Sequence, residues 1–220
     1  QNSTFWGNSG ATAGVFYNRA GKLTLINCSV SGNTTNSSTN GAIYIYDANN
    51  ASALLVNNIV AYNYNKSGYK DLSIGGSNSI ISGEYNLLTA SDATLNNSIN
   101  FSYNTTPLYS AYTTTTFGGK TIQIPELHLN GGTSSTLALA SASTAIGAGS
   151  NSIEGISFPS VDQRLYNRNL VNYTLGAFEQ TQCSAPTTLE VLSVSDNTNP
   201  PLSLFGYKIK YRETIQFLSI

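Results

Sequence analysis

The 220-residue sequence contains little charge, and this restricts its partners. Only 10% of the residues are Asp, Glu, Lys or Arg, and the formal net charge is −1. A protein that binds nucleic acid or an anionic membrane surface needs concentrated positive charge, so we expect no nucleic-acid partner. No apolar run approaches the ~20 residues of a membrane-spanning helix, so we also expect no membrane insertion by this segment.

Histidine, cysteine and methionine are scarce as well. His128 is the single histidine, methionine is missing, and the two cysteines are Cys28 and Cys183. One histidine excludes a zinc site built from several His, and we expect neither a metal nor a cofactor. Two cysteines do not indicate a disulfide framework. We interpret Cys28 as a small buried hydrophobe, and a Cys28–Cys183 bridge is the alternative.

Asn, Ser, Thr, Gly and Tyr supply the polarity instead, and a pattern built from them recurs. Leu23–Asn33 reads LTLINCSVSGN, Ala53–Asn63 reads ALLVNNIVAYN, and Ser3–Asn8 matches the second half of both. A weaker copy runs over Asn78–Asn86. The closing Asn residues lie 25, 30 and 23 positions apart. One unit of about 25 residues therefore recurs with loops of variable size, which is typical of a solenoid.

Each repeat divides into three short extended pieces. These are Leu23–Ile26, Ser29–Ser31 and Ala42–Tyr46 in the second repeat, and Ala53–Val56, Ile59–Ala61 and Asp71–Ile74 in the third. Gly and Asn separate the pieces, as expected where the backbone is left-handed. The pattern predicts an all-β fold, namely a right-handed parallel β-helix with an irregular C-terminal cap and a short terminal β segment.

Asn recurs at two predicted corners of the repeat. Asn27 and Asn57 share the first corner, and Asn8, Asn33 and Asn63 share the second. If the repeats stack at the ~4.8 Å spacing of β-strands, these amides can hydrogen-bond up and down the stack. We therefore interpret them as scaffold and not as a ligand site.

The second half of the chain carries two further motifs. Pro125–Gly149 reads PELHLNGGTSSTLALASASTAIGAG, and Asp162, Arg164 and Arg168 precede LGAFE at Leu175–Glu179. Together they resemble the motifs of the choice-of-anchor Q domain family, over roughly residues 1–182. The chain departs from the family pattern at Thr144, Leu165 and Thr174. The resemblance implies a secreted or surface-displayed bacterial parallel β-helix, hence an extracellular or cell-surface location, with no catalytic residue assigned to the motif.

The motif region is interpreted as a structural cap. The last repeat of a solenoid exposes unpaired strand edges unless something covers them. The predicted cap residues are the turn Asn130, Gly131 and Gly132 and the charge cluster Asp162, Arg164, Arg168 and Glu179. Opposite charges so close in sequence predict an ion-pair network that pins the cap. A carboxylate–arginine sugar or lyase site is the alternative.

Candidate catalytic and binding residues are few. Asp47 and Asp71, near the ends of the third extended pieces, are weak catalytic candidates, and solvated turn residues are the preferred interpretation. The candidates for binding are Tyr44, Tyr46, Tyr62, Tyr64 and Tyr69, which concentrate in the middle repeats. A tyrosine ring offers apolar area with a polar tip, which suits a sugar ring or a protein partner.

Three segments follow from these patterns. We expect β-helix repeats, incomplete at the N-terminus, over 1–91, a last irregular coil and the cap over 92–182, and over 183–220 a linker with either a terminal hairpin or the start of a fibronectin-III-like module. The predicted function is a non-enzymatic stalk, adhesin or filament subunit that binds a surface polysaccharide or another protein, or self-associates. A carbohydrate-active β-helix enzyme, a polysaccharide lyase or glycoside hydrolase, is the alternative.

Overall fold

A computed structural model of the chain describes residues 1–76, 79–92, 95–101, 107–180, 202–204 and 207–209, without the side chains of residues 47–49 and of those beyond 180. Every regular element in these residues is a β-strand, and none is a helix. The described chain is therefore all-β, as the composition predicted. It divides into two units, Gln1–Thr181 and Gln182–Ile220, which are described separately.

The strands of the first unit are short apart from two. They are β1 (Thr4–Trp6), β2 (Ser9–Gly10), β3 (Phe16–Ile26), β4 (Ser29–Ser31), β5 (Thr34–Thr35), β6 (Ile43–Val56), β7 (Ile59–Ala61), β8 (Tyr64–Asn65), β9 (Gly68–Tyr69), β10 (Leu72–Gly75), β11 (Ile80–Glu84), β12 (Leu87–Leu88), β13 (Ile99–Asn100), β14 (Tyr112–Phe117) and β15 (Lys120–Pro125). In the second unit, β16 (Leu202–Leu204) and β17 (Tyr207–Ile209) pair antiparallel.

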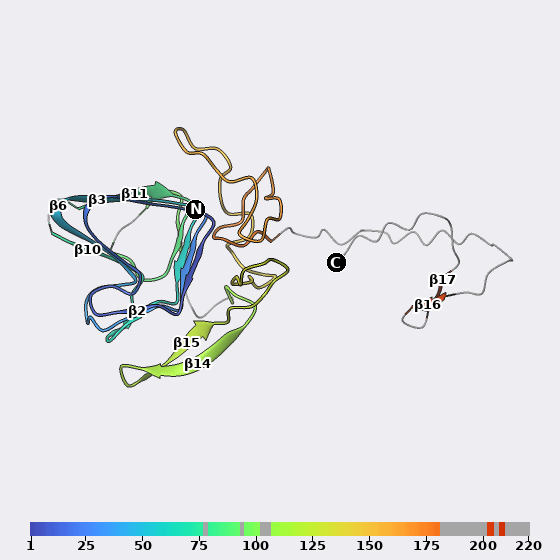
Figure 1. Ribbon diagram of the computed structural model, residues 1–220, viewed down its shortest axis with the longest axis horizontal. Coiled ribbons are helices and arrows are strands. Elements are labelled where there is room, and N and C mark those ends of the chain that lie inside the picture. Colours follow the sequence, from blue (N-terminus) through green and yellow to red (C-terminus); the bar gives the residue numbers. More distant parts are fainter. Residues whose placement is uncertain (77–78, 93–94, 102–106, 181–201, 205–206, 210–220) are drawn as a thin grey trace. The chain divides into compact units, whose positions relative to one another are not determined.

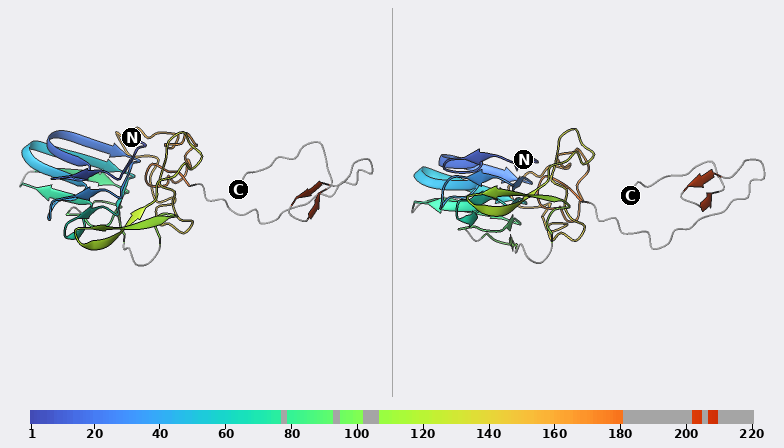
Figure 2. Two further views of the ribbon diagram at one scale, coloured as in Figure 1. Left: turned by 60° about the horizontal axis from the view of Figure 1, so that its bottom comes forward. Right: turned by 90° about the horizontal axis from the view of Figure 1, so that it is seen from below.

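Most strands of the first unit belong to three curled sheets of mainly parallel strands (Figure 1). The first sheet has the order β1-β4-β7-β12-β13, and all its neighbours are parallel. In the second, β3, β10 and β11 each pair parallel with β6. The third, β2-β5-β8-β9, is parallel except for its last pair. Figure 2 shows that successive repeats are layered in chain order.

The long strand β6 corrects the predicted division of the repeats. Ala42–Tyr46 and Ala53–Val56 were expected to be separate pieces, but a single strand runs over Ile43–Val56. The first half of β6 pairs with β10 and its second half with β11. On its other side, β3 accompanies β6 with two register shifts between Asn18 and Lys22. The chain stays extended here because neighbouring strands supply hydrogen-bond partners.

Asn side chains at equivalent positions of the repeats form a hydrogen-bonded ladder, as predicted for this corner. Asn33 Oδ1 accepts bonds from the backbone N (2.9 Å) and Nδ2 (3.0 Å) of Asn8. Asn63 Oδ1 accepts the same two bonds from Asn33, at 3.2 and 2.8 Å. Asn33 and Asn63 are fully buried, so no water replaces a lost partner. The ladder therefore favours one register between the repeats.

A second ladder differs from the predicted one. Asn58 Oδ1 accepts a bond from the Cys28 backbone N at 2.9 Å, and Asn86 Oδ1 accepts bonds from N (3.0 Å) and Nδ2 (2.9 Å) of Asn58. Asn86 is thus equivalent to Asn58, and its predicted equivalence to Asn63 is wrong. The reason is that β11 pairs with Ser52–Val56, the first half of the preceding motif.

Left-handed backbone marks two corners of the repeat. Asn2, Asn27 and Asn57 have φ values of 51°, 52° and 56° at the first corner. At the second corner, Gly32 has a φ of 71° and Tyr62 a φ of 58°. Asn and Gly adopt this conformation at the least cost, which explains their recurrence. The side chains of Asn27 and Asn57 belong to neither ladder, in contrast to the prediction for this corner.

The apolar side chains between the sheets form two clusters. One cluster joins successive repeats through residues such as Val30, Leu55 and Val60, each no more than 1% exposed. The other includes Ile59 and extends to Leu175 in the C-terminal part of the unit. Burial of apolar area contributes roughly 25 cal/mol per Å², so these clusters supply the main favourable term for folding.

Cys28 is a buried free cysteine inside the first of these clusters. The interpretation of Cys28 as a small buried hydrophobe is therefore confirmed. Cys183, its alternative disulfide partner, lies outside the described residues.

Strands β14 and β15 form an antiparallel hairpin that packs on the parallel sheets. Trp6 Nε1 donates a hydrogen bond to the carbonyl of Pro125 at 2.7 Å, and the Tyr64 hydroxyl donates one to the carbonyl of Gln123 at 2.5 Å. Gly32 permits this approach, because a Cβ there would lie 2.9 Å from the side chain of Ile124. Strand β15 is thus one arm of a hairpin whose other arm is β14.

Residues 126–180 have little regular structure and lie beside the five-stranded sheet (Figure 1). The Asn2 side chain donates to the carbonyl of Val161 at 2.5 Å. Ala177 N donates to Ser29 Oγ at 3.0 Å, and Gly176 N donates to the carbonyl of Asn57 at 2.8 Å. The segment therefore contacts three successive repeats, whereas the sequence interpretation placed it over the last repeat.

The ladder leads to the first prediction. Asn33→Ala should lower the free energy of unfolding by about 2–4 kcal/mol, because it leaves buried partners unpaired on both sides. Urea denaturation measures this loss. Asn8→Ala, at the exposed start of the same ladder, is the matched control and should cost under about 1 kcal/mol. Equal losses for the two variants would contradict the ladder's role.

Candidate functional site

Two charged residues of the C-terminal region meet beside the predicted Asn-Gly-Gly turn. Asp162 and Arg164 form a nearly buried ion pair, in which Oδ2 lies 2.7 Å from Nη2 and 2.8 Å from Nε. Arg164 also donates hydrogen bonds to the carbonyls of Asn130 (3.0 Å) and Glu179 (2.6 Å). The pair thereby joins the turn to the end of the LGAFE motif. Gly132 lies against Arg164, since a Cβ there would be 2.8 Å from the Arg164 side chain.

A second ion pair in this region is fully buried. Arg168 Nη1 lies 3.1 Å from Glu179 Oε2, and the same guanidinium donates to the carbonyls of Thr174 (3.2 Å) and Gly176 (2.9 Å). Its Nη2 donates to Asn2 Oδ1 at 2.7 Å. The Thr174 hydroxyl donates to Glu179 Oε1 at 2.9 Å. The pair therefore ties the C-terminal segment to the first repeat.

Burial shifts both groups of this pair toward their neutral forms. It raises the pKa of the Glu179 carboxyl and lowers the pKa of the Arg168 guanidinium, because a low dielectric disfavours each charge. The attraction between the two charges and their hydrogen bonds opposes both shifts. Buried ion pairs persist only where additional hydrogen bonds of this kind accompany the attraction between the two charges. These charges are consequently used inside the protein and are not directed at a ligand.

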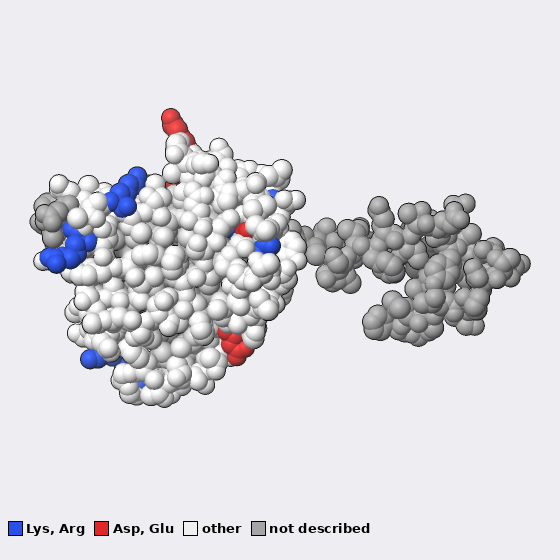
Figure 3. Space-filling model, in the orientation of Figure 1, with Lys and Arg blue, Asp and Glu red and all other residues white. Residues whose placement is uncertain are grey.

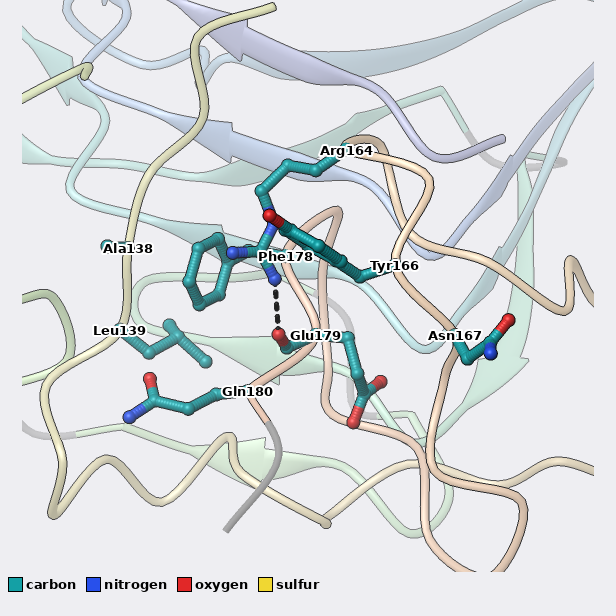
Figure 4. A pocket seen from close by; sticks show the side chains of 8 residues that line it. All are labelled: Ala138, Leu139, Arg164, Tyr166, Asn167, Phe178, Glu179 and Gln180. Atoms are coloured by element: carbon teal, nitrogen blue, oxygen red, sulfur yellow. Dashed lines mark hydrogen bonds between the residues drawn. The ribbon is translucent and has the colours of Figure 1, made fainter. Parts of the chain in front are cut away.

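A hollow of about 590 Å³ lies beside these ion pairs (Figure 4). Its lining residues are Ala138, Leu139, Arg164, Tyr166, Asn167, Phe178, Glu179 and Gln180. The Arg164 guanidinium carbon lies 3.7 Å from the ring centroid of Phe178 and 4.6 Å from that of Tyr166. Both rings stabilise the cation by cation–π contacts. Because Arg164 already binds Asp162 and two carbonyls, the hollow offers aromatic and amide surface but no unpaired acid–base group.

Asp71 is a buried carboxylate that ends the first Asn ladder. It is 0% exposed. Its Oδ1 accepts bonds from N (3.1 Å) and Nδ2 (2.8 Å) of Asn63, and its Oδ2 accepts bonds from the backbone N of Thr89 (2.9 Å) and Ala90 (3.0 Å). Burial raises its pKa to about 6, and the four N–H donors limit the rise.

This position makes the interpretation of Asp71 as a solvated turn residue wrong, and it leaves the carboxylate out of reach of a substrate. The side chain of Asp47, the other weak catalytic candidate, lies outside the described part of the structure. Only the backbone of Asp47 is placed, within β6.

Two of the five predicted binding tyrosines are core residues. Tyr62 and Tyr64 are each 2% exposed. The ring centroid of Tyr62 lies 5.0 Å from that of Tyr112 in β14, and the ring centroid of Tyr64 lies 4.5 Å from that of Tyr69. Tyr69 itself is 36% exposed. Tyr62 and Tyr64 therefore do not offer their rings to a partner, because a hairpin distant in sequence covers them.

The other two candidates, Tyr44 and Tyr46, form a partly exposed surface with two residues of β3. Tyr17 and Tyr44 are register partners, and their rings stack with centroids 5.3 Å apart and planes 3° apart. The Tyr46 centroid lies 5.8 Å from that of Tyr44. The Arg19 guanidinium lies 5.9 Å from the Tyr17 centroid and 5.8 Å from the Tyr46 centroid. We call these four residues the tyrosine–arginine surface.

The neighbouring strand leaves room for this surface. Strand β10 places Gly75 next to Tyr46. A Cβ at Gly75 would lie 2.2 Å from the Tyr44 hydroxyl and 2.8 Å from the Tyr46 ring, so any side chain would displace the rings. Tyr17 and Arg19 were missed by the sequence reasoning. The sequence feature that could have identified them is the register of the repeats, because it aligns Tyr17 with Tyr44.

Among the described residues, no group of three or more His, Cys, Asp or Glu side chains is arranged to hold a metal ion. His128, the single histidine, lies on the surface with Nε2 2.9 Å from the Glu126 carboxylate. The part of the chain described by the structure contains no helix that is long and apolar enough to cross a membrane.

Comparisons with known proteins do not assign the site. No family model, no curated protein and no solved structure matches the chain. The choice-of-anchor Q resemblance therefore stays a prediction from the motifs that carry it.

Asp71 predicts a pH dependence of stability. Its folded pKa of about 6 lies above the usual value of 3.8, so its contribution is fully present below pH 4 and is lost as the pH rises through 6. The free energy of unfolding should fall by about 3 kcal/mol over that window from this group. Urea denaturation of the wild type and Asp71→Asn between pH 4 and 8 measures it. In Asp71→Asn the free energy of unfolding should lack this dependence on pH. An unchanged dependence would refute its assignment to Asp71.

The buried ion pair predicts a large mutational effect. Arg168→Met should lower the free energy of unfolding by about 3–5 kcal/mol, because it leaves the Glu179 carboxylate buried without its counter-ion. Thermal or urea denaturation measures the loss. Lys22→Met, which removes an exposed lysine outside both ion pairs, is the control and should change stability by less than about 0.5 kcal/mol. A similar small effect for both variants would show that the pair is not important for the fold.

Proposed function

We propose that this chain is a non-enzymatic extracellular or cell-surface protein with a right-handed parallel β-helix fold, serving as a stalk, adhesin or assembly subunit. We further propose that it binds a polysaccharide through the tyrosine–arginine surface. The proposal is supported by the arrangement of its strands, by the pairing of its charges and by the partly exposed rings of Tyr17, Tyr44 and Tyr46.

The strand arrangement favours a β-helix. Each of the first repeats contributes one strand to each of three sheets, and neighbouring repeats pair parallel. Equivalent left-handed corners and Asn ladders recur from repeat to repeat. In stacked repeats of this kind each repeat contacts only its neighbours, and the stack presents an extended surface. Such a surface suits a protein that binds a partner outside the cell.

The charges of the described residues favour a non-enzymatic role. Three carboxylates, those of Asp71, Asp162 and Glu179, are buried and already accept several hydrogen bonds. The exposed Asp92 pairs with Lys70. Figure 3 shows a face that is largely uncharged, with a few separate acidic and basic groups. General acid–base catalysis needs a positioned acid and base within reach of the substrate. The exposed pairs on the described surface are Glu126 with His128 and Lys70 with Asp92, and none of these four residues lines the hollow beside the buried ion pairs.

The observation that carries the binding proposal is the tyrosine–arginine surface. Tyr17 is 43% exposed, and Tyr44 and Tyr46 are half-buried, so the rings are fixed by the sheet yet reachable. Sugar rings present C–H faces that pack on aromatic rings, and hydroxyl groups that accept bonds from phenol and guanidinium donors. Tyr17 and Tyr44 lie on adjacent strands with ring centroids 5.3 Å apart, and Tyr46 lies two residues after Tyr44 on the same strand.

A binding experiment tests this proposal. Native electrophoresis through gels that contain single neutral or acidic polysaccharides should show retardation of the wild type by at least one of them. Tyr17→Ala combined with Tyr44→Ala should weaken that binding by about tenfold or more, because two stacking rings are lost.

Leu170→Ala is the control, since it removes a side chain that is 73% exposed in another part of the unit. It should leave the retardation unchanged, and thermal melts should show that all variants fold. Equal binding by the control and the double variant would contradict the site. Release of new reducing ends from a polysaccharide by the wild type would favour the carbohydrate-active enzyme instead.

A further inference from the structure

Asn27 is a fully buried amide whose side-chain oxygen and nitrogen have no hydrogen-bond partner among the described residues. Burying an unpaired amide is costly, and most buried polar groups in proteins have a protein or water partner. The left-handed φ of 52° explains why Asn or Gly is favoured here, but it does not explain why the larger side chain is present. Asn27 therefore requires a partner.

The neighbours of Asn27 show where its side chain is directed. Asn2 and Asn57 occupy the same corner one repeat before and one repeat after it. The Asn57 amide exchanges two hydrogen bonds with the backbone of Ser150, at 2.6 and 3.0 Å. The Asn2 amide donates to the carbonyl of Val161 at 2.5 Å. Both side chains hold the C-terminal segment, so the side chain of Asn27, between them, faces the same segment.

Arg168 supplies a second unpaired group at this place. Its Nε is buried and has no partner among the described residues, whereas its Nη1 and Nη2 are fully engaged. Its Nη2 donates to Asn2 Oδ1 and to the carbonyl of Gly176. Asn2 N in turn donates to the carbonyl of Ile26, and Gly176 N donates to that of Asn57. Arg168 is thus held at both repeats that flank Asn27.

The unpaired atoms define the ligand by their chemistry. Asn27 offers an amide donor and a carbonyl acceptor, and Arg168 Nε offers one further donor. The adjacent guanidinium disfavours a cation, and the carbonyl oxygen of Asn27 disfavours an anion. A water molecule accepts from two donors and donates to the acceptor, which satisfies all three atoms. We propose that Asn27 and Arg168 bind one internal water that bridges the second repeat to the C-terminal segment.

Substitution by glycine separates this water site from a purely conformational role. Gly is at least as favourable as Asn at a left-handed φ, so Asn27→Gly should be neutral or stabilising if only the backbone matters. If the amide holds the bridging water, the variant should instead lower the melting temperature by about 3–6 °C.

Asn97→Gly is the matched control, because Asn97 has a φ of 49° and an exposed side chain. It should leave the melting temperature unchanged or slightly raised. An Asn27→Gly protein that melts like the Asn97→Gly protein would overturn the proposal.

Two direct measurements complete the test and do not depend on the variant alone. Water ¹⁷O relaxation dispersion should find one fewer long-lived internal water in Asn27→Gly than in the wild type, and an equal number would overturn the proposal. A high-resolution crystal structure of the wild type should show a water within hydrogen-bond distance of Asn27 Oδ1 and Arg168 Nε. Direct hydrogen bonds from protein atoms to Asn27 Oδ1 and Arg168 Nε, with no water between them, would refute the site. This result does not depend on whether the variant folds.

Discussion

Pairing of buried amides between successive repeats is the constraint on which the rest of this structure depends. Asn33 and Asn63 in one ladder, and Asn58 and Asn86 in the other, are fully buried, and each oxygen accepts bonds from the repeat before it. A shift of one repeat by a single residue would leave several amides unpaired in a low dielectric. The amide pairing therefore fixes the register of the parallel strands. The register in turn determines which side chains lie beside one another on the outer faces of the sheets.

The C-terminal segment depends on the same stack. Arg168 reaches Asn2 in the first repeat, and Gly176 reaches Asn57 in the third. These contacts form only when the equivalent corners of successive repeats are stacked on one another. Carbonyls, the Thr174 hydroxyl and backbone N–H groups supply the other hydrogen bonds of the two ion pairs, and Arg168 Nε is the exception among the described atoms. Polar chemistry in this chain is therefore mostly internal, and the tyrosine–arginine surface is an exception on the outside.

Sequence reasoning succeeded where the information was local or strictly periodic. The ladder of Asn8, Asn33 and Asn63 follows from the recurrence of Asn at the same corner of the repeat. It failed for Asn86, because the short motif around it resembles either half of the repeat and only strand pairing with Ser52–Val56 decides between them. It failed for Tyr62, because the hairpin that buries it lies about fifty residues further along the chain.

By itself, the sequence determined an all-β chain with little charge, a repeat of variable length, and Asn or Gly at the left-handed corners. Composition and backbone preference act within a few residues, so they can be deduced locally. Only the tertiary structure decided which acids are buried, as Asp71 is, and which tyrosines remain reachable, as Tyr17 is. Burial is set by segments remote in sequence, because each side chain's environment exists only once the repeats and the C-terminal segment have packed.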